Sequence, residues 1–376
     1  MRQVERTKVP QVLHCMWSAG IGGAERAVFQ FIRSQTQRSR YRPAIAYSQS
    51  QGFYGDEIRS LGVEVIDLGL KTDKSFPQSL RIRKLMARFP IHQFHSAEIT
   101  PMLASVLCPG VRRIYTHRSG DSEYFGTQRA RYEIVGFIAR NYFQGLVGNT
   151  GRACTSGARV MRTPVSKWRT IYNGIDFSML RPLRPREVVA SEIGLPLDGC
   201  LVIGTSAHLR DVKRIELLIQ ACVNLKPRSF WLLIVGDGPA RANLEDLSRH
   251  LQIDTRTIFP GMKEHVGDYL QLMDVFVLPS SSAESFGNSA VEAMGQGLPT
   301  IVFSDGGGLL EHINNAQTGF IVSSTEELSA RLTDLALHPE LRLRLGNAAS
   351  EYVTRRYSYE NLVASYDDLY DELLSN

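Results

Sequence analysis

Two glutamates eight residues apart form the most chemically suggestive pattern in the sequence. They lie in residues 275–292, VFVLPSSSAESFGNSAVE, where an apolar run ends at Pro279, a loop of small residues carries Glu284, and a predicted helix beginning near Phe286 carries Glu292. The two carboxylates can accept hydrogen bonds from hydroxyl groups on two parts of one ligand. The loop amides and the helix N-terminus favour an anion such as phosphate. On its own, the segment is more simply explained by a solvated loop that carries Glu284 and a helix face on which Glu292 is paired.

A cationic group follows another apolar run, at residues 201–205. It contains His208, Arg210 and Lys213. An ammonium about 4 Å from a phosphate contributes on the order of 4 kcal/mol at an effective dielectric near 20. Lys213 could therefore neutralise a diphosphate leaving group. An isolated lysine at a helix start is more often a surface residue.

Glycines and one histidine complete the candidate set. Gly22 and Gly23 follow the first predicted strand and open a helix, where a backbone without side chains can approach a ligand closely. A turn that needs glycine is an equally good explanation. Gly236 follows a strand in the same way within GDGP, and His117 ends a strand, where a structural role is the simpler interpretation of a single histidine.

The bulk composition indicates a globular protein of two domains. The 376 residues are 43% hydrophobic and 22% charged, and the five cysteines include no C-x-x-C pair, which favours a reducing, cytoplasmic location. The sequence suggests neither a signal peptide nor a membrane span. The charge is unevenly divided: residues 1–182 carry 27 Lys and Arg against 12 Asp and Glu, whereas residues 183–376 carry 16 against 26. A basic half can attract anionic substrates, lipid or nucleic acid, or be only a solvated surface.

Apolar, β-branched runs alternate with amphipathic stretches along the whole chain, which predicts parallel sheets with crossover helices. We expect a first series of strands at 9–16, 43–47, 63–68, 91–95, 113–116, 145–148 and 169–172. A second series is expected at 201–205, 231–235, 257–259, 275–278, 300–303 and 320–322. The Pro-rich stretch 179–196 is predicted to be an exposed linker, with the domain boundary at 182. The last helix, about 359–376, has no strand after it and is free to pack back on the first domain.

Six motifs in this order resemble the large retaining glycosyltransferase family 4, which has the GT-B architecture. They are GGAER (22–26), THR (116–118), YNGID (172–176), RDVKR (210–214), VGDGP (235–239) and the E-x7-E segment, which EAMGQGLP and DGGGLLE follow. The resemblance implies an α/β, GT-B fold: two tandem Rossmann-like doubly wound domains with an interdomain active-site cleft. It implies an N-terminal acceptor-binding domain, residues 1–182, and a C-terminal donor-binding domain, residues 183–376.

The resemblance also implies a role for each candidate residue. His117, Lys213 and Glu284 would be catalytic, with His117 orienting the reacting sugar and Glu284 holding it. Glu292 would hold the ribose of a nucleotide-sugar donor, and Met262 would contact its base through the backbone. The other donor-binding residues implied are Gly22, Gly23, Arg210, Gly236, Phe286, Gly287 and Asn288. The family usually has Arg where this chain has His208, so either His208 or Arg210 could contact the diphosphate.

The implied reaction is a retaining transfer of a hexose or N-acetylhexosamine from a nucleotide-diphosphate sugar, a UDP-sugar before GDP-mannose. The acceptor would be a glycan or a lipid-linked sugar in bacterial polysaccharide, lipopolysaccharide or glycolipid biosynthesis. Relatives are described by front-face attack, in which the leaving phosphate accepts the acceptor's proton. The sequence has no D-x-D motif, so we expect no metal and no other cofactor.

A basic amphipathic segment, residues 79–89, interleaves Arg81, Arg83, Lys84 and Arg88 with apolar residues. It predicts either an ordinary helix that covers the sheet or peripheral attachment to the inner face of the cytoplasmic membrane through anionic lipid.

Two other functions remain open. One is an isomerase resembling a UDP-sugar 2-epimerase, which incubation with the nucleotide sugar alone would reveal. The other is a non-catalytic nucleotide-sugar-binding subunit of the same fold. We expect no nucleic-acid partner, because the basic segments lack interleaved aromatic residues or a recognition motif.

Overall fold

The computed structural model describes residues 11–18, 23–49, 52–70, 75–118, 129–225 and 229–375. Gly22 lies outside these residues. The chain divides into two compact units, one of residues 1–174 with 359–376 and the other of residues 175–358. Among the residues described, no helix has both the length and the apolar character to cross a bilayer.

The first unit is built on a seven-stranded parallel sheet with the order β3-β2-β1-β4-β5-β6-β7. Its strands are β1 (Gln11–Met16), β2 (Arg42–Tyr47), β3 (Glu64–Asp67), β4 (Ile91–Phe94), β5 (Arg112–His117), β6 (Gly145–Gly148) and β7 (Trp168–Thr170). Its helices are α1 (Gly23–Arg38), α2 (Gly52–Ser60), α3 (Phe76–Met86), α4 (Ile99–Val106), α5 (Arg129–Tyr142), α6 (Gly151–Met161) and α14 (Tyr359–Ser375). The short 3-10 helix η2 (Val165–Lys167) precedes β7.

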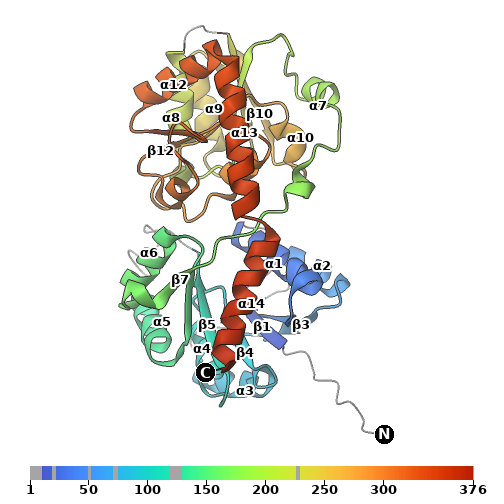
Figure 1. The fold of residues 1–376 in the computed structure, drawn as a ribbon, viewed down its shortest axis with the longest axis vertical. Helices are drawn as coiled ribbons and strands as arrows, with labels where there is room; N and C mark the ends of the chain where they lie inside the picture. Colours follow the sequence, from blue (N-terminus) through green and yellow to red (C-terminus); the bar gives the residue numbers. More distant parts are fainter. Residues whose placement is uncertain are drawn as a thin grey trace. The chain divides into compact units, whose positions relative to one another are not determined.

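Both faces of this sheet are buried, because successive strand residues point to opposite faces and both sets are apolar. Val12 and Ile91 pack with α14, whereas Leu13 and Phe94 pack in a second cluster with residues of α3 to α6. Figure 1 shows α14 running beside the sheet, in contact with α1. The last helix therefore belongs to the first unit.

Polar bonds fasten α14 to the loop that precedes β2. Asp367 accepts hydrogen bonds from Ser39 Oγ (2.5 Å) and from the Arg40 amide (2.9 Å). At the start of α14, a Cβ on Gly174 would lie 2.6 Å from the Tyr359 ring, so the glycine lets the two segments pack closely.

The second unit has a six-stranded parallel sheet with the order β10-β9-β8-β11-β12-β13. Its strands are β8 (Leu201–Ser206), β9 (Phe230–Val235), β10 (Thr257–Gly261), β11 (Val275–Leu278), β12 (Thr300–Phe303) and β13 (Gly319–Val322). Its helices are α7 (Arg186–Glu192), α8 (Ile215–Val223), α9 (Arg241–His250), α10 (Gly267–Leu270), α11 (Asn288–Gly295), α12 (Thr325–Leu337) and α13 (Pro339–Arg356). Four 3-10 helices are η3 (Phe177–Leu180), η4 (Asp211–Lys213), η5 (Asp254–Arg256) and η6 (Gly307–Glu311).

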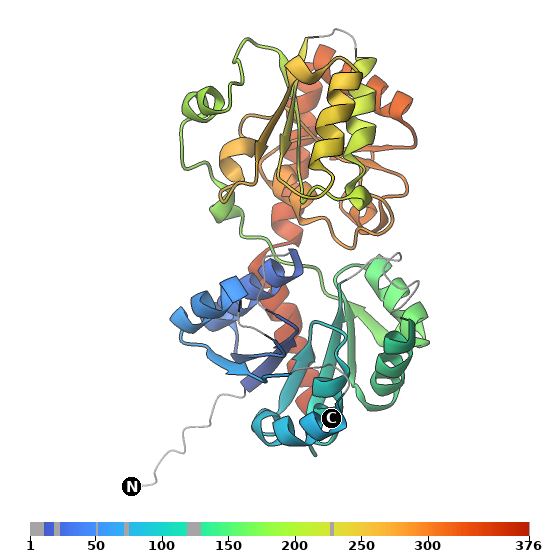
Figure 2. The same ribbon diagram turned by 180° about the vertical axis from the view of Figure 1, so that it is seen from behind.

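Helices cover both faces of the second sheet as well. Residues of α8, α9 and α12 form one apolar cluster with strand residues such as Ile203 and Leu232, and α8 and α9 lie side by side in Figure 2. On the other side, α11 contacts β11 and α13. The strands and the last helix predicted from the sequence correspond to observed elements within a few residues.

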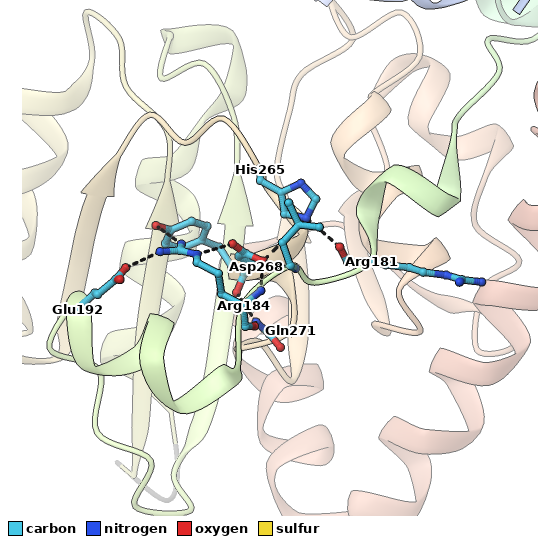
Figure 3. Close-up of polar contacts among 8 residues, drawn as sticks. Arg181, Arg184, Glu192, His265, Asp268 and Gln271 are labelled. Carbon is cyan, nitrogen blue, oxygen red and sulfur yellow. Dashed lines mark hydrogen bonds and ion pairs between the residues drawn. The ribbon is translucent and has the colours of Figure 1, made fainter.

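Most of residues 179–196 are exposed, as predicted, but the stretch is not a free linker, because it lies within the second unit. Leu180, Val189 and Ala190 are buried, and α7 lies inside this stretch. Figure 3 shows Arg184 next to Asp268, which is buried in α10. Asp268 accepts hydrogen bonds from the Leu183 amide and from Arg184 Nε, both at 2.7 Å. A buried carboxylate far along the chain thus fastens the segment to the second unit.

The two units divide earlier than the boundary predicted at residue 182. Gly174 ends the first stretch, and the amide of the next residue, Ile175, donates to the Tyr357 carbonyl (2.8 Å) within the second unit. Residues 175–182 therefore pack with the C-terminal domain.

Candidate functional site

Most of the predicted donor-site residues lie at one edge of the second sheet. Because its strands are parallel, the segments that follow β8, β9, β10, β11 and β12 all leave at the carboxyl edge, where such folds bind ligands. Those segments carry Arg210, Lys213, Gly236, Met262, Glu284, Phe286, Gly287 and Asn288. We call this set the β8–β12 edge.

An ion pair at the β8–β12 edge joins Lys213 and Glu284. The Lys213 ammonium donates a hydrogen bond to Glu284 Oε2, and both side chains are nearly buried, at 14% and 13% exposure. Ser280 Oγ donates to the same carboxylate oxygen (3.1 Å). Burial raises the pKa of Glu284, but the Lys213 charge and hydrogen bond, Ser280 and the Arg210 charge together outweigh it and lower the pKa. Glu284 is thus a carboxylate.

Arg214 fixes the turn that carries Lys213. Its guanidinium forms a two-point ion pair with Asp305 (2.5 and 2.8 Å) and donates to the carbonyls of Pro279 (2.8 Å) and Ser280 (3.1 Å). The Ser281 amide also donates to the Val212 carbonyl (3.0 Å). The segments after β8, β11 and β12 are therefore bound together, which keeps Lys213 and Glu284 next to each other.

A glycine supports the backbone beneath Glu284. Gly307 has φ +60°, and a Cβ there would lie 2.6 Å from the Glu284 carbonyl oxygen. The next amide, of Gly308, donates to that same carbonyl (3.0 Å). The close approach explains why this position is glycine.

Phe286 is anchored by a buried histidine. His312 Nε2 lies 2.7 Å from the Phe286 carbonyl, so this nitrogen carries the proton, and Tyr357 Oη lies 2.7 Å from Nδ1. The rings of Phe286 and His312 pack edge to face at 4.5 Å. Burial lowers the pKa of His312 to about 4, despite its bond to the Phe286 carbonyl. A neutral histidine thus fixes the loop that precedes α11.

Helix α11 begins at Asn288, slightly later than predicted. Gly287 precedes it with φ +77° and ψ +57°, a left-handed conformation that cannot continue a right-handed helix. A Cβ on Gly287 would also lie 2.1 Å from Leu309. Glu292 lies on α11 and is buried, at 7% exposure.

Gly236 meets protein backbone at close range. It has φ +130°, and a Cβ there would lie 1.9 Å from the Ala207 carbonyl oxygen. Its amide donates to the Gly261 carbonyl (3.0 Å), which places it beside Met262, an exposed side chain (63%). The close contact with Ala207, in the segment after β8, therefore explains why position 236 is glycine.

Both candidates for the phosphate contact are exposed. His208 and Arg210 lie in the segment between β8 and η4. The Arg210 charge contributes to the lowered pKa of Glu284, so it acts on the paired carboxylate.

The first unit carries the remaining predicted residues. His117 ends β5 and is 1% exposed; its ring packs edge to face against Trp168 at 6.0 Å, and its Nδ1 lies 3.4 Å from Tyr115 Oη. Gly23 begins α1, as predicted, whereas Gly22 lies outside the described residues.

A comparison with protein families gives a match within the second unit. Residues 194–352, which include Lys213, Glu284 and Glu292, match the family described as glycosyl transferases group 1. The second unit is therefore similar to group 1 glycosyl transferases over this range.

Curated relatives of this chain include two bacterial enzymes. N-acetyl-alpha-D-glucosaminyl L-malate synthase of Bacillus anthracis is 31% identical over 209 residues, 55% of this chain and 54% of that protein. The lipopolysaccharide core biosynthesis glycosyltransferase LpsD of Rhizobium meliloti is 32% identical over 200 residues, 52% and 56% of the two chains. The matched region thus spans about half the length of these relatives.

Solved structures extend the likeness to the whole fold. The Anabaena protein HepE, in complex with UDP and glucose, has a TM-score of 0.84 at 17% identity and covers 97% of this chain and 100% of its own. Sucrose-phosphate synthase from Thermosynechococcus elongatus has a TM-score of 0.77 at 18% identity, with 97% and 99% covered. The two sheets are the Rossmann-like domains of the GT-B fold.

Three residues that support the candidate site were not predicted from the sequence: Arg214, Asp305 and His312. Arg214 and Asp305 stand inside matched motifs, but nothing in either motif shows that the two side chains pair. His312 directly follows DGGGLLE, and its bond to the Phe286 carbonyl depends on tertiary packing.

Proposed function

We propose that this protein is a retaining, metal-independent glycosyltransferase that uses a nucleotide-diphosphate sugar. The observation that carries the proposal is the contact between Lys213 and Glu284, 71 residues apart in sequence, at the β8–β12 edge of a unit similar to group 1 glycosyl transferases. When a ligand with a diphosphate and sugar hydroxyls binds, the ammonium can move to the diphosphate and the carboxylate can accept hydrogen bonds from the hydroxyls.

In the proposed reaction, Lys213 turns from Glu284 to the diphosphate of the donor. Its charge stabilises the negative charge that develops as the bond from the anomeric carbon to phosphate oxygen breaks. Glu284 then accepts hydrogen bonds from the transferred sugar, and Glu292 from the ribose. The acceptor hydroxyl forms the new bond on the same face, and its proton passes to the leaving diphosphate. His117 orients the sugar.

A UDP-sugar carrying a hexose or N-acetylhexosamine is the first candidate donor, because the similar HepE structure contains UDP and glucose. A glycan or lipid-linked acceptor is favoured by the name of the LpsD relative. The cytoplasm, where nucleotide sugars are made, is the proposed location.

Thermal stabilisation by UDP-glucose, UDP-galactose, UDP-GlcNAc and GDP-mannose tests the donor, since a ligand that binds only the folded state raises its melting temperature. Transfer by the selected donor should retain the anomeric configuration in NMR spectra of the product and persist in excess chelator. Inversion, or activity that only Mn²⁺ restores, would contradict the mechanism. An epimeric nucleotide sugar formed without any acceptor would indicate an isomerase instead.

Peripheral attachment to anionic membrane is proposed for α3. The side chains of Phe76 and Leu80 are 57% and 46% exposed, next to the exposed cations Arg83 and Lys84, whereas Ile82 and Met86 are buried. Apolar groups beside cations suit an anionic lipid surface. The protein should sediment with vesicles rich in phosphatidylglycerol at low salt, and not with neutral vesicles. Sedimentation that is equal with both, or absent with both, would exclude this attachment.

A further inference from the structure

A chain of buried polar side chains crosses the first unit and ends at His95. This residue directly follows β4 and is 6% exposed. Its Nε2 lies 2.9 Å from Nδ1 of His14, on β1, and His14 Nε2 lies 2.8 Å from Gln35 Oε1, on α1. The two imidazole rings also stack, with centroids 5.2 Å apart.

The far end of the chain orients the Gln35 amide. Tyr370, on α14, donates its hydroxyl proton to Gln93 Oε1, so Tyr370 Oη is free to accept from Gln35 Nε2 (3.3 Å). Gln35 Oε1 therefore faces His14 as an acceptor.

The protons of both histidines follow from this orientation. Because Gln35 Oε1 only accepts, His14 Nε2 carries the proton and His14 Nδ1 has the lone pair. His95 Nε2 must then donate to His14. Burial lowers the pKa of His14 to about 3 and that of His95 well below its ordinary value, so both rings are neutral. His95 Nδ1 is consequently a hydrogen-bond acceptor.

Two buried polar atoms at this edge have no hydrogen-bond partner among the residues that the structure describes. One is His95 Nδ1 and the other is Arg118 Nε, whose guanidinium donates through Nη1 to Asn173 Oδ1 (2.7 Å). Phe94 of β4 is in register with Tyr115 of β5, so the segments with His95 and Arg118 leave neighbouring strands at the same edge. The Arg118 charge helps to lower the pKa of His95, so the two side chains lie near each other. An unpaired acceptor and an unpaired charged N–H are costly unless a ligand satisfies them.

We propose that His95 Nδ1 and Arg118 Nε bind one hydroxyl group of a neutral sugar or polyol. A hydroxyl donates its proton to the first atom and accepts from the second with the same oxygen. A sulfate or carboxylate only accepts, so it would leave the neutral His95 unpaired. If the proposed function is correct, this ligand is the acceptor of the transferred sugar.

The ¹⁵N resonances of the imidazole rings test the proposal directly, because they report which nitrogen carries the proton. The full-length protein is titrated with glucose, galactose, N-acetylglucosamine and myo-inositol, one at a time, and with sulfate as the ion that only accepts. We expect at least one of the four neutral probes to shift the ¹⁵N resonance of His95 Nδ1, while Nε2 keeps its proton. Sulfate should leave Nδ1 unchanged.

Two variants separate ligand binding from structure. Arg118→Lys keeps the charge but loses Nε, and should weaken the effective probe by about tenfold, as expected for a lost charged hydrogen bond. His95→Phe should abolish binding. His92→Gln is the matched control: His92 lies on β4 with both nitrogens paired, to Ser105 Oγ (2.7 Å) and the Met86 carbonyl (2.9 Å), and its replacement should lower the melting temperature but not the probe affinity.

The proposal is overturned if none of the four probes shifts His95 Nδ1, if both variants bind the probe as wild type does, or if a crystal soaked with the probe shows water alone between the two atoms. Stabilisation by UDP, measured in the same variants, should not change. A protein that binds the neutral probe at His95 but no nucleotide would contradict the proposed function and leave this site standing.

Discussion

At the carboxyl edge of the first sheet, the polar groups singled out above are mainly buried, neutral histidines, whereas the β8–β12 edge also carries two ion pairs. His14 and His95 belong to a chain of hydrogen bonds that leads into the core. Lys213 and Glu284, and next to them Arg214 and Asp305, form ion pairs.

The difference indicates two kinds of recognition within one fold. A neutral imidazole whose second nitrogen is fixed by the core can distinguish a donor from an acceptor, which suits hydroxyl groups. An ammonium paired with a carboxylate leaves neither charge unpaired before a ligand binds. The two groups can then contact the anionic part and the hydroxyl groups of one ligand. The next three experiments test whether the two edges differ in this way.

Lys213→Ala should have the largest effect. It removes the cation proposed to face the diphosphate and leaves Glu284 unpaired in a nearly buried position, so we expect kcat/KM to fall on the order of 10³-fold. Transfer from the donor selected by thermal stabilisation measures this fall.

A second variant separates the two causes. Lys213→Ala combined with Glu284→Gln removes the unpaired charge, so it should recover melting temperature but not activity. Arg249→Ala breaks only an exposed pair with Asp246 and should change neither. Near-normal transfer by Lys213→Ala would mean that the pair is structural.

The sequence predicts the fold well because apolar, β-branched runs mark buried parallel strands whatever surrounds them. Its motifs also identify Lys213 and Glu284 as candidate site residues. It cannot predict that Arg214 pairs with Asp305, or that His95 ends a chain which begins on α14, because those contacts join elements distant in sequence. The segment at 179–196 shows the converse, since its proline and charge suggest an exposed linker until the buried Asp268 is seen beside it.

Mild acid should destabilise the first unit more than the second. The folded-state pKa values of His14 and His92, about 3 and 4, lie below the ordinary value of 6.5, so the unfolded chain binds more protons as the pH falls and stability decreases. Between pH 6.5 and 4.5, each such histidine costs roughly 2 kcal/mol. In the second unit, the comparable loss comes from His312, with a pKa of about 4.

Tryptophan fluorescence can follow the units separately, because Trp17 and Trp168 lie in the first unit and Trp231 in the second. Urea unfolding of Trp231→Phe reports on the first unit, and unfolding of the double variant Trp17→Phe, Trp168→Phe on the second. The lowered pKa values of Glu284 and Asp268 place their protonation below this pH window. Equal loss of stability in both units would remove the contrast between the two edges.

Arg214→Lys should have the smallest effect of the three, a fall in kcat/KM on the order of tenfold to a hundredfold. Lysine keeps the charge but cannot span Asp305 and the carbonyls of Pro279 and Ser280, so the turn that carries Lys213 loosens. Because Arg214 acts through Lys213, the loss should appear mainly in kcat, with KM for the donor little changed. Arg331→Lys, at an exposed pair with Asp334, is the matched control and should behave as wild type. A loss confined to KM would instead indicate that Arg214 itself contacts the donor, and the β8–β12 edge would then present two cations to the diphosphate.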